Sequence, residues 1–252
     1  MIKYTINKSF EKVFDDPIWK LEVDSTYNCI AVETRNQETT LPSFSVITFD
    51  GDNVLYDFQV ESKEWTLEAI QGDYLILKKY GSSSPVQAGI RVIHIPSKEC
   101  ICDFMEYVLK EVYQGYIYAI HRSIPAGLNF YINIQTGDIT NHLSDITYPS
   151  NEINLPISYQ GSLPKFMNEI DYVDQIWLQP LIQDHFLWSY HTGTHSNFNL
   201  NLTLSSKNEL FDSKVILKGI TKLIPQPYFS VKEHIFFLSS NKKEITTYLV
   251  LL

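Results

Sequence analysis

The sequence has 252 residues and a formal net charge of −9. This acidic balance disfavours binding to nucleic-acid phosphates or to an anionic membrane surface, because both repel a negatively charged protein. Hydrophobic residues make up 44% of the sequence and aromatic residues 13%, which excludes wholesale disorder and favours β-strands over helices.

The N-terminal stretch MIKYTINKSFEKVF lacks the apolar core of a signal peptide, and no run of about 18 apolar residues follows anywhere. We therefore expect a cytoplasmic protein. Cys29, Cys100 and Cys102 are too few and too scattered for a disulfide framework. The pair Cys100 and Cys102 has no second pair, so reduced thiols in a strand are favoured over a metal or redox site.

Strand–turn–strand patterns recur along the chain, each with an alternating strand, a polar turn and a second strand. These hairpins are expected at residues 45–58, 90–104, 129–143 and 199–213. A more apolar strand precedes each hairpin, and a fifth lies near the C-terminus; these strands are expected at 29–35, 74–80, 116–122, 186–192 and 235–241. Further extended segments, such as IWKLEV and EWTLEAI, come before them and give about four strands per unit.

The units repeat roughly every 40–50 residues, which is typical of β-propeller blades. One interval is longer and indicates an insertion at about 144–175, between the third and fourth units. Its start is rich in turn residues, and KFMNEIDYVDQ within it favours a short helix. We expect this insertion to protrude and regard it as the best candidate for a partner-specific element.

The fifth unit is one strand short, and residues 3–10 supply a spare strand at the N-terminus. Pairing of the two ends would protect the edge strands of a ring. We therefore predict one all-β domain over residues 1–252, a five-bladed β-propeller whose N-terminal strand completes the last blade. A β-sandwich and an irregular β-solenoid remain alternatives, because they also contain short strands at regular spacing.

Three motifs in the first half of the chain carry a family resemblance: AVETR at 31–35, W-x-L-E at 65–68 and PVQAGI at 85–90. With them the chain resembles an uncharacterised bacterial domain-of-unknown-function family with β-propeller-like character. The resemblance fades after the insertion. It implies a fold and no activity, since the family has no established one.

Polar residues stand at the ends of the five aligned apolar strands. The candidates for ligand binding are Arg35, Lys79, His121, Arg122 and His191. If each strand is innermost in its blade, these residues surround one mouth of a central channel. Such a positive mouth would suit a small anion, a carboxylated metabolite or an acidic peptide tail. The alternative is that the strands simply become polar where they reach solvent.

His191 and His195 are four residues apart, which is the spacing with which a helix binds zinc. The strand alignment instead makes 192–194 a hairpin connection, across which the two imidazoles would face each other. No third ligand is specified nearby. Structural or solvent-facing histidines are therefore favoured, and we predict neither a metal nor a cofactor.

Motifs for nucleotide binding, a nucleophile elbow and a zinc protease are absent from the sequence. Glycosidases place two or three carboxylates around a channel, but among the aligned residues only Glu33 is acidic. Asp73, Asp184 and Glu233 would gather at the opposite mouth, although their position before strands is typical of turns.

We therefore expect a non-catalytic binding or scaffolding module, with an unknown protein or a small anionic ligand as its partner. The alternative is a glycosidase-like hydrolase with its site at one mouth of the channel.

Overall fold

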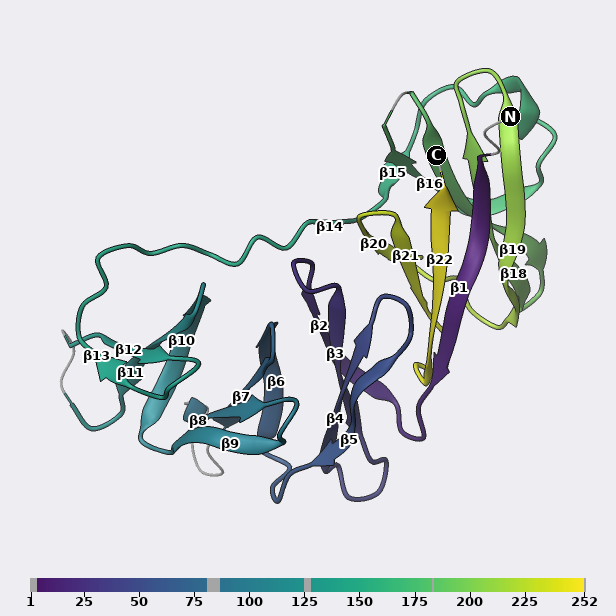
Figure 1. Ribbon diagram of the computed structural model, residues 1–252. Helices are drawn as coiled ribbons and strands as arrows, with labels where there is room; N and C mark the ends of the chain where they lie inside the picture. The colour runs from purple at the N-terminus through teal and green to yellow at the C-terminus, as the bar shows by residue number, and fades with distance from the viewer. Residues whose placement is uncertain (1–3, 81–86, 125–127, 183, 252) are drawn as a thin grey trace. The chain divides into compact units, whose positions relative to one another are not determined.

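The chain is all-β in this computed structural model, which describes residues 4–80, 87–124, 128–182 and 184–251 (Figure 1). Among these residues the only helix is a 3-10 turn at Lys165–Met167, and no helix is long and apolar enough to span a membrane. Contacts divide the chain into two compact units. We call Phe14–Asn151 the middle unit, and Met1–Val13 with Glu152–Leu252 the terminal unit.

The middle unit consists of three four-stranded antiparallel sheets, and the strand order in each follows the chain. The strands are β2 (Ile18–Asp24), β3 (Cys29–Arg35), β4 (Pro42–Thr48) and β5 (Asn53–Gln59); β6 (Trp65–Gln71), β7 (Tyr74–Tyr80), β8 (Gln87–His94) and β9 (Glu99–Phe104); and β10 (Tyr107–Tyr113), β11 (Tyr116–His121), β12 (Phe130–Asn133) and β13 (Ile139–Thr140). The predicted hairpins of this unit are confirmed as β4–β5, β8–β9 and β12–β13.

The apolar strands recognised in the sequence lie inside their sheets. β3, β7 and β11 each pair with a neighbour on both sides, as do β17 and β21 of the terminal unit. Their assignment as innermost strands is therefore wrong, because an innermost strand would have one open edge. Their apolar character has a physical reason. Residues 30–34 of β3 are all buried, whereas the edge strand β5 is mostly exposed.

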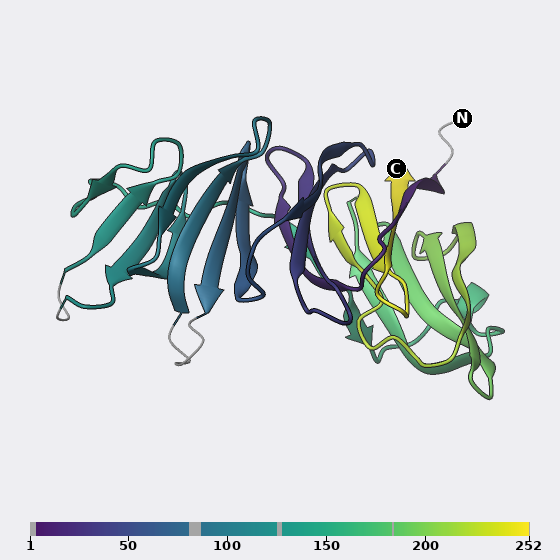
Figure 2. The same ribbon diagram turned by 90° about the horizontal axis from the view of Figure 1, so that it is seen from below.

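Consecutive sheets of the middle unit pack face to face through two apolar cores. The first core joins the sheets β2–β5 and β6–β9 and contains Phe44 and Trp65, which are fully buried. The second joins β6–β9 to β10–β13 through residues such as Ile76, Ile117 and Ile132. Figure 2 shows the blue strands of the one sheet beside the teal strands of the other. This packing brings the turns before β3, β7 and β11 to a common rim.

The terminal unit contains two five-stranded antiparallel sheets. One has the order β15 (Ile157–Tyr159), β16 (Tyr172–Pro180), β17 (Phe186–Thr194), β18 (Asn197–Ser205) and β19 (Leu210–Ile220). The other has the order β1 (Thr5–Val13), β22 (Glu244–Leu251), β21 (His234–Leu238), β20 (Phe229–Val231) and β14 (Ile153–Asn154). The predicted hairpin at 199–213 is confirmed as β18–β19, and one apolar core joins the two sheets.

The N-terminal strand completes the C-terminal sheet, as the sequence predicts. β1 pairs antiparallel with β22, and Thr5 stands opposite Leu251. In Figure 1 the purple strand β1 lies beside the yellow strand β22. β22 therefore has a neighbour on both sides and does not form an open edge. The chain divides into two units by contacts, and the single domain expected over residues 1–252 stays a prediction.

Much of the expected insertion at 144–175 belongs to the terminal unit. β14 pairs with β20 and β15 pairs with β16, so each adds a strand to a sheet edge. The short helix predicted in this region is the turn Lys165–Met167, and Met167 is buried in a cluster with Trp188 and Tyr190. The expectation that the insertion protrudes is wrong for this part, because its apolar side chains cover a sheet face.

Candidate ligand-binding pocket

Arg35, one of the expected channel-mouth residues, is held by groups of the protein itself. Its Nε donates to the Glu33 carboxylate at 2.7 Å. Its terminal nitrogens donate to the carbonyl oxygens of Thr40, Lys63 and Trp65 at 3.2, 2.8 and 2.9 Å. These four bonds occupy most of the five N–H groups of a guanidinium. Arg35 therefore ties the first sheet to the start of the second.

Lys79 lies near Arg35, because both residues contact Trp65. The Lys79 Nζ is 5.5 Å from the centre of the Trp65 ring and 3.8 Å from the Glu64 carboxylate. The structure thus brings Arg35 and Lys79 to one place on the middle unit, and each is already paired with a carboxylate.

His121 and Arg122 form a second, separate group in the third sheet. The His121 Nε2 is 3.0 Å from a Glu106 carboxylate oxygen, and the Arg122 N–H donates to the Glu106 carbonyl oxygen at 2.9 Å. Arg122 is exposed. Within the described part of the middle unit, no hydrogen bond or ion pair joins this group to Arg35 or Lys79. A ligand role for the five candidates stays a prediction.

His191 and His195 do not face each other. β17 continues to Thr194, and the turn consists of His195 and Ser196, both with a positive φ. His191 stands opposite Leu200 in the hairpin, so its expected approach to His195 is wrong. The reason is the length of the hairpin, whose two-residue turn begins three positions later than expected.

The His191 side chain is buried, with 2% exposed, and its Nε2 accepts the Ile224 N–H at 3.2 Å. This bond and the surrounding packing give it a structural role. Across the described residues, no group of three or more His, Cys, Asp or Glu side chains is arranged to hold a metal. Cys102 and the other cysteines are free thiols, and burial raises the pKa of Cys102 to about 12.

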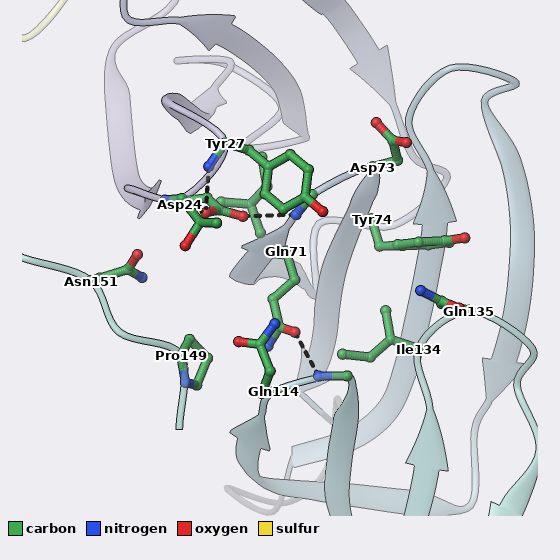
Figure 3. Close-up of a pocket in the computed structure, with 14 residues that line it drawn as sticks. Asp24, Tyr27, Gln71, Asp73, Tyr74, Gln114, Ile134, Gln135, Pro149 and Asn151 are labelled. Atoms are coloured by element: carbon green, nitrogen blue, oxygen red, sulfur yellow. Dashed lines mark hydrogen bonds between the residues drawn. The ribbon is translucent and has the colours of Figure 1, made fainter. Parts of the chain in front are cut away.

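A polar pocket of about 210 Å³ lies where the turns of the three middle-unit sheets meet (Figure 3). Its wall is made by the turns β2–β3, β6–β7 and β10–β11, by the end of β12, and by a segment that follows the third sheet. Ile70 and Ile134, both buried, supply its apolar part. The remaining lining is dominated by amide, carboxylate and tyrosine side chains.

Asp24, the last residue of β2, is the buried carboxylate of this pocket. Its Oδ1 accepts the N–H groups of Thr26 and Tyr27 at 2.9 and 3.1 Å, which closes its own turn. Its Oδ2 accepts the Gly72 N–H at 2.7 Å, which links the turn to the next sheet. All three of these hydrogen bonds come from backbone N–H groups.

Gln71 makes an equivalent link from the second sheet to the third. Its Oε1 accepts the Gly115 N–H at 2.9 Å, and its Nε2 donates to the Tyr113 carbonyl oxygen at 2.7 Å. Gly72, the next residue, has a φ of +55°, and a Cβ there would lie 3.1 Å from the Tyr27 ring. Position 72 therefore needs glycine, because glycine adopts the positive φ without strain and leaves room for the Tyr27 ring.

Other polar side chains of the pocket are available to a ligand. Within the described part of the chain, the side chains of Asp73, Gln114 and Gln135 make no hydrogen bond, and all three are exposed. Tyr27 is 61% exposed. Tyr74 is half-buried, and its ring packs 5.4 Å from that of His94. Figure 3 shows these side chains around one hollow.

Residues 147–151, at the start of the expected insertion, close one side of the pocket. The Gln114 N–H donates to the Thr147 carbonyl oxygen at 2.8 Å. The Ser25 N–H donates to Asn151 Oδ1 at 3.0 Å. This segment therefore ties the turn of the third sheet to the turn of the first, and Figure 3 shows Asn151 at the edge of the hollow.

Sequence reasoning identified only one residue of this pocket. It placed Asp73 at a channel mouth with Asp184 and Glu233, but those two belong to the terminal unit. The signal that could have found the site is a Gln-Gly pair, which occurs before β7 as Gln71-Gly72 and before β11 as Gln114-Gly115.

The terminal unit carries a groove of different chemistry at the turns that lead into β17 and β21. This groove has a volume of about 810 Å³, and apolar residues such as Leu181, Ile235 and Val250 dominate its lining. Gln179 also lines it and donates to Ser230 Oγ at 2.7 Å.

Comparison with known proteins adds little to this geometry. No protein-family model matches the sequence, and no curated protein matches it. Among solved structures the chain is similar to one titled "Crystal structure of Chaetomium thermophilum Raptor", with 8% sequence identity and a TM-score of 0.40. The match covers 98% of this chain and 29% of that one, so this chain spans less than a third of its length.

Proposed function

We propose that the chain is a non-catalytic binding module and that the polar pocket of the middle unit is its ligand site. One observation carries the proposal: the buried Asp24 is engaged by three backbone N–H groups, while exposed polar side chains around it are available. A catalytic acid or base needs a proton-transfer position that faces the substrate. Asp24 is held by its three backbone donors, whereas the pocket rim has several exposed polar groups that suit recognition.

The ligand of this pocket is neutral or cationic. Asp24 and Asp73 are its charged side chains, and none of the residues that line it is a lysine, arginine or histidine. The whole chain is also acidic, with a net charge of −9. Both features repel an anion, so the small anionic ligand expected from the sequence is less well supported here than an uncharged one.

The proposal also covers the arrangement of the five sheets. The five sheets are blades of a five-bladed β-propeller, with β1 completing the last blade. Support comes from three apolar cores of the same kind, two between sheets of the middle unit and one in the terminal unit. Further support comes from the pairing of β1 with β22. A cytoplasmic location also belongs to the proposal.

A glycosidase-like hydrolase is the alternative, because two carboxylates, Asp24 and Asp73, line the same pocket. Glycosidases need two carboxyl groups that flank one glycosidic bond. In Figure 3 the carboxylates of Asp24 and Asp73 do not point toward each other. The engagement of Asp24 by backbone donors is a second reason to rank this alternative lower.

The test is an NMR titration of the full chain with small fragments that are neutral, cationic or anionic. The backbone N–H signals of Gly72 and Gly115 are the reporters, because both groups lie in the pocket. We expect saturable shifts of these signals with neutral or cationic fragments, and none with anionic ones. Asp73→Asn and Gln135→Ala should weaken binding, while Gln37→Ala, an exposed glutamine outside the pocket, should not.

Two outcomes would count against the proposal. Fragments that bind only elsewhere on the protein would remove the pocket as its ligand site. Turnover of aryl glycosides that is lost in Asp73→Asn would favour the hydrolase instead.

A further inference from the structure

We infer that the pocket of the middle unit takes a single neutral sugar ring, and this inference rests on the proposed function of the same site. Three features of the pocket lead to it: the hydrogen-bonding character of its available side chains, its exposed aromatic rings and its size.

The available polar side chains suit hydroxyl groups better than they suit a cation. Gln114 and Gln135 each carry a carbonyl oxygen that accepts and an NH₂ group that donates. A cation would use only the acceptors and would leave the NH₂ groups of both amides facing it. A hydroxyl both donates and accepts, so it can bond to either end of an amide. Asp73 adds an acceptor that favours a donor such as a hydroxyl.

The aromatic rings provide faces for an apolar surface. Tyr27 lies against Gly72, where no side chain intervenes, and its ring is largely exposed. Tyr74 presents a second ring to the same hollow (Figure 3). An aromatic face carries partial negative charge and attracts the weakly positive C–H groups of a saturated ring.

The size of the pocket restricts the ligand to one small ring. Its volume of about 210 Å³ is below the roughly 300–1,000 Å³ of pockets for drug-sized ligands. A sugar ring combines the three required properties, since it has C–H groups on its faces, hydroxyl groups around its rim and no charge. A short peptide without proline offers amides but has no saturated ring face for Tyr27.

The experiment titrates the full chain with methyl β-D-glucopyranoside, methyl α-D-mannopyranoside and methyl β-D-galactopyranoside, with the Gly72 and Gly115 N–H signals as reporters. Choline, N-acetylglycine methylamide and glucose 6-phosphate serve as cationic, amide and anionic comparators. We expect at least one glycoside to shift both signals saturably and more tightly than all three comparators.

Variants of Tyr27 then test whether stacking of its ring on the ligand contributes to binding. Tyr27→Ala should weaken glycoside binding roughly tenfold, as expected for the loss of one aromatic contact, and Tyr27→Phe should retain most of it. Tyr56→Ala is the matched control, because Tyr56 is an exposed tyrosine of the same unit that does not line the pocket. Equal effects of Tyr27→Ala and Tyr56→Ala would overturn the inference.

The comparators distinguish the two ways of failing. If choline or the amide shifts the Gly72 and Gly115 signals saturably and no glycoside does, the inference of a sugar ligand is overturned. The proposal of a binding module is then retained. No effect of any probe on these signals overturns both.

Discussion

Glu33 shows how a charged residue acts as a structural element of this fold. Its side chain is fully buried, with 0% exposed. It accepts hydrogen bonds from Arg35 Nε and Thr66 Oγ1, both at 2.7 Å, and from the Leu67 N–H at 2.8 Å. Because a buried charge is tolerated only where protein donors replace water, the carboxylate holds β3 and β6 at a fixed distance.

Replacing Glu33 by glutamine should therefore destabilise the protein by about 3 kcal/mol, because an uncompensated Arg35 charge is left beside a weaker acceptor. The change is measured as a lower midpoint of urea unfolding. Glu38→Gln, at an exposed site of the same unit, should leave the midpoint unchanged. If the Glu33→Gln protein is as stable as the parent, the negative charge of Glu33 does not contribute to the stability of the fold.

Burial lowers the pKa of His191 below its ordinary value of 6.5, with Asp174 opposing this effect. Unfolding frees the imidazole to bind a proton, so its contribution to stability is complete above pH 6.5. As the pH falls below 6.5, the unfolded chain gains protons first and the stability declines.

Thermal unfolding between pH 8 and 5 should show this decline in stability, and His191→Gln should reduce it. His195→Gln, at the exposed turn, is the control, and an equal effect of both variants would exclude His191 as the source.

At the scale of elements, β1 shows how a strand distant in the sequence completes a sheet. Ile6 is fully buried in the apolar core of the terminal unit, and its N–H donates to Asp212 Oδ2 at 2.9 Å. Asn7, the next residue, points the opposite way and is exposed. The alternation of a strand thus gives β1 one face for the core and one for solvent.

Ile6→Ala should cost about 2–5 kcal/mol of unfolding free energy, as expected for a buried aliphatic side chain replaced by alanine. Asn7→Ala should change it by less than about 0.5 kcal/mol. Chemical unfolding of both proteins measures the difference. If the two variants are equally stable, β1 does not hold the terminal unit together and its pairing with β22 is dispensable.

At the scale of the whole molecule, the same architecture presents two different surfaces. The turns that lead into β3, β7 and β11 enclose a polar pocket in the middle unit. The turns that lead into β17 and β21 border an apolar groove in the terminal unit. Polar turn residues such as Asp73 and Gln114 line the pocket, whereas apolar strand residues such as Leu187, Ile235 and Val250 line the groove, and this gives the two surfaces their different chemistry.

The sequence by itself determined the strands and their local pairing. Alternating and apolar runs located β3, β7 and the hairpins such as β4–β5, because burial of one or both faces imposes a period that can be read from residue types. The spare strand at the N-terminus likewise indicated the partner of β22.

Only the tertiary structure decided which side chains meet. Arg35 has its donors occupied by carbonyl oxygens of other strands, and Asp24 meets Gly72 from a turn 48 residues away. These contacts depend on how one sheet stacks on the next, which no local pattern specifies. The candidate site lies in turns joined by such contacts, and for that reason strand periodicity predicted the scaffold while the pocket emerged from its packing.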